Sequence, residues 1–361
     1  MPQASRLRYF AACNSENGFH SFYSDVFPES LSRVYIIKGG PGTGKSSLMR
    51  RAADRAVKRG YRVEEIYCSS DPNSLDGVIA YADAGHGGIA VLDGTAPHIH
   101  EAALAGARDE ILNVGEFWFC EALVKRRKDI ETLSRARSEA FAQLYRYLQA
   151  AGQCARNMES VIAGGVDTRK IRETITSILT SYPIGGGASR KIMLMRSIGM
   201  SGAVRLSTME EQADSVYLLR DCGSIAYRML DELSSQAEKR HLQMWISYDP
   251  LMPSRMDGIY LPEMRSAFLV CEDVSAIKEG LDGKKIHQIS MRRYVSTDLL
   301  TRSSGALSTA SRNRDRLMRA AYSVLDEIRE KHFSLEQIYK ETMDFTTLNR
   351  RVELWLDAIM P

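Results

Sequence analysis

Residues 34–51, VYIIKGGPGTGKSSLMRR, decide the fold of this chain. Four apolar residues, 34–37, precede a run of glycines, and apolar residues then recur at helical spacing from Leu48 onward. Gly60 stands where a glycine often ends a helix. This order predicts a buried parallel strand, a glycine-rich loop and a helix, the start of an α/β fold.

The glycine-rich loop matches the pattern G-x-x-x-x-G-K-[ST], which holds the phosphates of a nucleotide. Glycines let backbone N–H groups approach a phosphate chain, and the helix that follows adds positive potential. Lys45 can reach the β- and γ-phosphates, and the Ser46 hydroxyl can ligate Mg²⁺. The predicted nucleotide-binding residues are Gly39, Gly40, Pro41, Gly42, Thr43, Gly44, Lys45, Ser46 and Ser47.

A second nucleotide signal is the segment 88–93, GIAVLD, in which four apolar residues end in a carboxylate. One helix and one strand (61–67) are expected between the loop and this segment. We therefore expect Asp93 opposite Ser46 in the Mg²⁺ shell, and we assign catalytic roles to Lys45 and Asp93. Gly94 follows where many ATPases carry a carboxylate that orients water. This difference suggests slow hydrolysis, a base from elsewhere, or an acceptor other than water.

Three further side chains are candidates for contacting a substrate or sensing the nucleotide. Asp71 and Asp76 lie in the turn-rich run 68–77, beyond a predicted strand, where ligands bind in open α/β sheets. The alternative is that both only cap turns or helix starts. His98 follows Asp93 and is a candidate sensor or acid/base group, or else a surface histidine.

Length and composition limit the possible classes of protein. A chain of 361 residues suggests two domains, and a net charge of +3 is too small to indicate nucleic acid or a membrane as partner. The basic cluster 125–128 is interpreted as a solvated helix face because acidic residues interleave with it. Six cysteines without a C-x-x-C pair, and no apolar stretch of about 20 residues, predict a cytoplasmic protein.

The chain contains an internal repeat. A shift of 182 positions places the strand 34–38 on 216–220, and with one deletion 72–78 falls on 253–259. Residues 101–181 have a helical pattern, and 182–189 resemble a linker. We predict a nucleotide-binding domain at 1–181, with a helical segment from about 101, and a degenerate copy at 182–361 with C-terminal helices.

The second copy has lost the residues that bind phosphate. Asp221 replaces Gly39, and Tyr227 replaces Lys45. The same alignment replaces Ser46 by Arg228 and Asp93 by Cys271. We therefore predict one nucleotide per chain, bound in the first half, with the second half kept as a packing partner.

Several segments carry a family resemblance: GFHSFYSDVF (18–27), the loop region 34–53, CSSDPNSLDGVI (68–79), AVLDGTAPH (90–98) and DEILNVGEFW (109–118). Over about residues 8–150 the chain resembles bacterial tandem P-loop ATPases labelled "ATPase" or "nucleotide kinase". Members commonly keep both phosphate loops, and this chain does not. The resemblance implies two tandem P-loop NTPase folds, with mostly parallel sheets, flanking helices and helical insertions. It also implies ATP and Mg²⁺ at 39–47 and Asp93, but no substrate.

Three functions follow as hypotheses. The first is a cytoplasmic ATPase with one active site that couples its nucleotide state to an unknown protein partner. The second is a small-molecule or nucleotide kinase, in which Asp71 or Asp76 orients the acceptor. The third is a nucleotide-gated regulatory module with negligible turnover.

Overall fold

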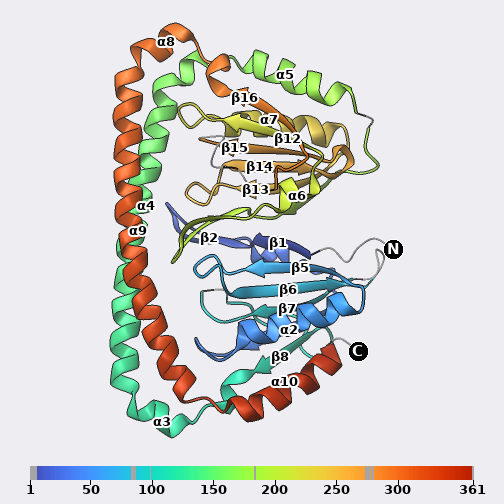
Figure 1. Cartoon of the computed structure of the whole chain (residues 1–361), viewed down its shortest axis with the longest axis vertical. Coiled ribbons are helices and arrows are strands. Elements are labelled where there is room, and N and C mark those ends of the chain that lie inside the picture. The colour runs from blue at the N-terminus through green and yellow to red at the C-terminus, as the bar shows by residue number, and fades with distance from the viewer. Residues whose placement is uncertain are drawn as a thin grey trace.

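The computed structural model describes residues 6–82, 87–97, 99–182, 184–272, 277 and 280–359, and in them two six-stranded mixed sheets are flanked by helices (Figure 1). The predicted α/β class is confirmed. The first sheet has the order β1 (Arg6–Phe10), β5 (Arg62–Tyr67), β6 (Leu75–Tyr81), β7 (Ile89–Asp93), β4 (Arg33–Lys38), β8 (Asp109–Asn113). The second has the order β9 (Ser189–Ile192), β13 (Gln243–Tyr248), β14 (Met256–Leu261), β15 (Ser266–Cys271), β12 (Ser215–Arg220), β16 (Lys285–Ser290).

The two sheets have the same strand order and the same strand directions. In each, the third strand runs antiparallel to both neighbours and the other pairings are parallel. The sheets are therefore mixed, and the expectation of one strand between the loop helix and Asp93 is wrong. Strand β6 was missed because Asp76 and Gly77 are poor strand formers. Gly77 is needed there, since a Cβ would lie 2.5 Å from the Phe27 ring.

The helices occur in the same order in the two halves of the chain. They are α2 (Lys45–Lys58), α3 (Cys120–Lys125), α4 (Arg127–Ile162), α5 (Thr168–Thr180), α7 (Tyr227–Lys239), α8 (Thr297–Arg302), α9 (Ser304–Glu341) and α10 (Phe345–Ile359), with short α1 (Tyr23–Val26) and α6 (Thr208–Gln212). Two hairpins join β2 (Ala12–Ser15) to β3 (Gly18–Ser21) and β10 (Arg196–Gly199) to β11 (Gly202–Arg205). The first helical segment begins at Cys120 rather than near 101, because 109–113 form a strand beside β4. Among the described helices, none is long and apolar enough to cross a membrane.

The long helices α4 and α9 lie side by side along both sheets and carry the chain from one sheet to the other (Figure 1). Helices α3, α4 and α5 begin at 120, 127 and 168, and α8, α9 and α10 begin 177 residues later, at 297, 304 and 345. Helix α5 packs in the core of the second sheet, against α7. Helix α10 packs in the core of the first sheet, against α2. The division at 181/182 remains a prediction about sequence copies, since each sheet's core includes a helix of the other copy.

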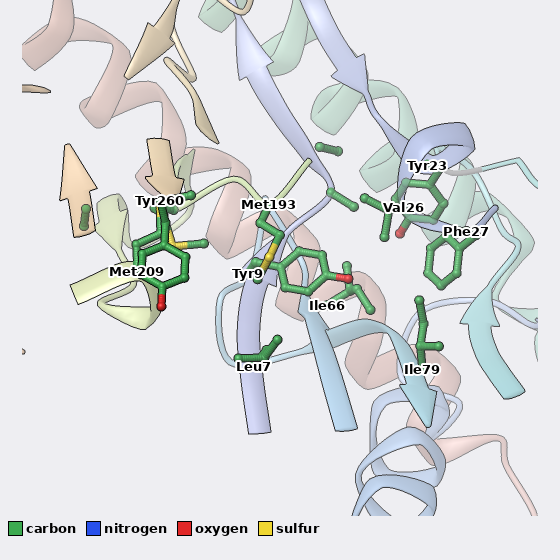
Figure 2. Packing of buried hydrophobic residues seen from close by; sticks show 14 of the residues in the cluster. Leu7, Tyr9, Tyr23, Val26, Phe27, Ile66, Ile79, Met193, Met209 and Tyr260 are labelled. Carbon is green, nitrogen blue, oxygen red and sulfur yellow. The ribbon is translucent and has the colours of Figure 1, made fainter. Parts of the chain in front are cut away.

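A shared core joins the two sheet units (Figure 2). Leu7 and Tyr9 of β1 belong to the same buried cluster as Met193 and Met209 of the second half. At the edge of this core, Glu64 accepts a hydrogen bond from the Tyr9 hydroxyl at 2.7 Å and pairs with Lys191. Burial of apolar side chains from both halves against each other stabilises the two units as one body.

Candidate functional site

The glycine-rich segment Gly39 to Ser46, named here the first loop, joins β4 to α2. Gly42 and Gly44 have φ angles of 72° and 82°, which side chains disfavour. Among the described residues, none accepts a hydrogen bond from the backbone N–H of Gly42, Thr43 or Gly44. These three donors lie at the start of a 14-residue helix. The arrangement is that of an anion-binding nest.

Lys45 lies folded over the first loop. Its Nζ donates hydrogen bonds to the carbonyl oxygens of Gly39 and Gly40, at 2.8 and 2.7 Å. It also forms an ion pair with Asp93, with Nζ and Oδ2 3.5 Å apart. The structure thus brings together the two residues to which the sequence assigned catalytic roles. Ser47 is exposed in the first turn of α2.

Asp93 ends β7 and accepts hydrogen bonds from the N–H of Thr95, at 2.9 Å, and from its hydroxyl. Burial raises the pKa of Asp93, and the Lys45 ammonium opposes this shift without cancelling it. The nearby carboxylate of Asp76 adds to the rise in the pKa of Asp93. Next to Asp76, the N–H of Leu75 donates to the Ser46 hydroxyl at 3.0 Å. Ser46, Asp76 and Asp93 therefore gather at the start of α2.

The other two candidates are placed differently. Asp71 accepts hydrogen bonds from the N–H of Asn73 at 3.1 Å and from the Ser74 hydroxyl at 2.7 Å, as a turn-capping aspartate does. It is not among the residues that line the cleft described next. His98 lies outside the described residues.

A cleft of about 960 Å³ lies between part of the first loop and the α4–α9 pair. Its loop side includes Gly39, Gly40, Pro41, Lys45, Asp76, Asp93, Thr95 and Trp118, and its helix side includes Arg137, Ser138, Phe141, Tyr145, Ile328 and His332. The indole Nε1 of Trp118 is buried without a hydrogen-bond partner in the described part of the chain. Helix α9 closes over the loop, since a Cβ at Gly42 would lie 2.6 Å from the Glu336 carbonyl oxygen.

The helix side of this cleft was not predicted. Arg137, Phe141 and Tyr145 recur at four-residue spacing, which places them on one face of α4. That spacing is visible in the sequence, but it gives no sign of what the face lies against. Only the path of α4 past the edge of the first sheet brings this face of the helix opposite the first loop.

The equivalent segment of the second half, Asp221 to Arg228, is named the second loop, and an internal carboxylate fills its nest. Asp221 accepts hydrogen bonds from the N–H groups of Ser224, Ile225 and Ala226, at 2.9, 3.0 and 2.8 Å. These are the counterparts of the three donors of the first loop. Ser224 keeps a positive φ of 65°, as Gly42 does. The second loop thus retains part of the turn, with its own anion in place.

A second internal carboxylate, Glu159 of α4, neutralises the cations near the second loop. It accepts hydrogen bonds from the Tyr227 hydroxyl, from Arg228 and from Arg255, each at 2.6 Å. Burial alone would raise the pKa of Glu159, but these hydrogen bonds outweigh it and lower the pKa. The cavity left at this loop is about 90 Å³. Arg228 is therefore engaged within the protein.

The sheet register corrects one pairing of the sequence alignment. Asp93 lies opposite Ile37 of β4, and the counterpart of Ile37 is Leu219. Leu219 lies opposite Val270, so Val270 rather than Cys271 occupies the position of Asp93. The alignment slipped by one residue because both segments are uniformly apolar. The second half still has no metal-binding carboxylate at the position of Asp93, since neither Val270 nor Cys271 offers a hard oxygen ligand.

Comparison of the chain with protein-family models, curated proteins and solved structures found no match. Its function therefore has to be inferred from the two loops and the cleft.

Proposed function

We propose that this chain is a P-loop NTPase that binds ATP with Mg²⁺ at the first loop and hydrolyses it, with one active site per chain. The contrast between the two loops carries the proposal. Asp221 supplies carboxylate oxygens to three N–H groups of the second loop. A nucleotide phosphate would supply oxygens to the corresponding N–H groups of the first loop. The family resemblance over residues 8–150 points the same way.

The residues around the first loop fit the triphosphate and its metal. The N–H groups of Gly42, Thr43 and Gly44 would hold phosphate oxygens. Trp118, whose ring lies against Gly40, adds a buried Nε1 donor that has no partner among the described residues. Lys45 would exchange its carbonyl partners for the terminal phosphate. The Ser46 hydroxyl and the Asp93 carboxylate are the oxygen ligands that Mg²⁺ prefers. When bound, the ion neutralises charge on the phosphates.

Titration with a slowly hydrolysed ATP analogue tests this proposal. Calorimetry with Mg²⁺ present is expected to give one analogue per chain. The second loop should not bind, because Asp221 and Glu159 would repel a polyphosphate. No binding, or two sites per chain, would overturn the proposal.

Asp93→Asn is expected to weaken analogue affinity by about tenfold or more with Mg²⁺ present and by much less without it. The carboxylate acts on the metal, whereas the backbone amides hold the phosphates. Because the pKa of Asp93 is raised, its charge is present at higher pH and is lost as pH falls through that pKa. Wild-type affinity with Mg²⁺ should therefore fall earlier on acidification than that of Asp93→Asn. Equal losses with and without Mg²⁺ would remove Asp93 from the metal site.

A kinase is the second candidate, and the size of the cleft favours it. About 960 Å³ is at the upper end of the range for small-molecule sites, so the cleft has room beyond the phosphates. Incubation with γ-labelled ATP and a metabolite extract separates the candidates. Free labelled phosphate supports hydrolysis, and a labelled metabolite supports phosphate transfer. Bound nucleotide without either product supports the regulatory module.

A further inference from the structure

Arg137 of α4 projects into the cleft as a half-buried cation. Within the described residues it forms no ion pair with a carboxylate, and its Nη1 lies 3.5 Å from Nδ1 of His332. Burial, together with the nearby guanidinium, lowers the pKa of His332, so the imidazole is neutral at neutral pH. Taking a guanidinium out of water without an anion is costly. The site is therefore suited to a ligand that brings a negative charge.

In the second half, the arginine at the equivalent position has a carboxylate partner within the chain. Arg314 of α9 lies 177 residues after Arg137 and lines the small cavity at the second loop. Its Nη2 is 2.7 Å from Oε1 of Glu272, a carboxylate of the chain itself. Thr95 stands at the matching position in the first half, since Val270 matches Asp93. Thr95 is uncharged, so the first half lacks this carboxylate.

An aromatic surface continues from Arg137 along the same face of α4. The rings of Phe141 and Tyr145 stack, with centroids 6.0 Å apart and planes at 29°. The Tyr145 hydroxyl donates to Oδ1 of Asn14 at 3.0 Å, and the Asn14 amide donates to a backbone carbonyl at 2.8 Å. This chain of hydrogen bonds fixes the Tyr145 ring. A planar aromatic group could pack on these rings with little loss of side-chain entropy.

We propose that the helix side of the cleft binds a second small molecule, with an anionic group on Arg137 and a planar aromatic body against Phe141 and Tyr145. This inference rests on the proposed function in that the nucleotide phosphates occupy the loop side of the same cleft. The chemistry is that of a nucleoside monophosphate or another aromatic phosphate or carboxylate. Arg137 offers a planar, bidentate match to either anion.

Calorimetry on the full chain, first saturated with Mg²⁺ and the slowly hydrolysed ATP analogue, tests the inference. The probes are AMP, GMP, CMP, UMP, phenyl phosphate and benzoate, with adenosine as the uncharged match to AMP. At least one charged probe should bind once per chain, and Arg137→Gln should weaken it by about tenfold or more. Affinity for the analogue should change by less than about threefold. Arg135→Gln, an exposed arginine on the same helix, is the matched control and should change neither.

Other results would overturn the inference. These are the absence of binding by every probe at millimolar concentration, binding that only displaces the analogue, or Arg137→Gln weakening the analogue but not the probe. The last result would assign Arg137 to the nucleotide's own phosphate. If the analogue itself fails to bind wild type, the proposed function fails, which is a separate outcome. Thermal unfolding of each variant shows whether the fold is retained.

Discussion

Lys45→Ala is expected to lose about a hundredfold or more in affinity for the Mg²⁺–ATP analogue, and to lose turnover with it. The ammonium lies over the first loop, within 2.8 Å of the Gly39 and Gly40 carbonyl oxygens, and 3.5 Å from Asp93. A triphosphate bound as proposed would place its charge in this space, and no other side chain of the first loop is cationic. Calorimetry and a phosphate-release assay measure the two effects.

The fold of Lys45→Ala should survive. Within the described residues the Lys45 ammonium contacts two loop carbonyl oxygens and the Asp93 carboxylate, and Asp93 can take up a proton when this cation is removed, since burial already raises its pKa. Lys58→Ala, at the exposed far end of α2, removes the same charge from the same helix and should leave binding unchanged. Full affinity and activity in Lys45→Ala, or an equal loss in Lys58→Ala, would show that the first loop is not the nucleotide site.

Leu356→Ala is expected to lower the free energy of unfolding by about 2–5 kcal/mol. Leu356 lies on α10, near the end of the chain, and is 1% exposed in the core of the first sheet. Truncation would leave a cavity between α10 and α2, the helix that begins with Lys45. Urea denaturation measures the difference.

Leu354→Ala is the matched control, because this residue stands two positions away on the same helix and is 60% exposed. Its effect should stay within about 0.5 kcal/mol. Similar small effects of both substitutions would mean that α10 does not pack on the first sheet. The exchange of helices between the halves would then be wrong.

The structural features that depend on residues near one another in the sequence could be predicted. The strand, first loop and helix of 34–58 formed where the pattern placed them, because glycine positions, apolar runs and helical spacing are local signals. The duplication was also visible, and the shared strand order of the two sheets agrees with it. The departure of the second loop from the phosphate-binding pattern could be seen in single replacements such as Asp221 for Gly39. The three hydrogen bonds that the Asp221 carboxylate accepts could not.

Tertiary structure alone decided which segments far apart in the sequence pack against one another. Strand β6 escaped prediction because its glycine is required by the Phe27 ring, a partner 50 residues away. Helix α5 packs on the second sheet and α10 on the first. Both helices have a similar apolar face, and the sequence of such a face does not indicate which of the two sheets it will cover. Arg137 lines the cleft because α4 passes the first loop as it runs from the first sheet to the second. The residue type determines the chemical group of a side chain, but its function depends on the neighbours that tertiary packing places around it.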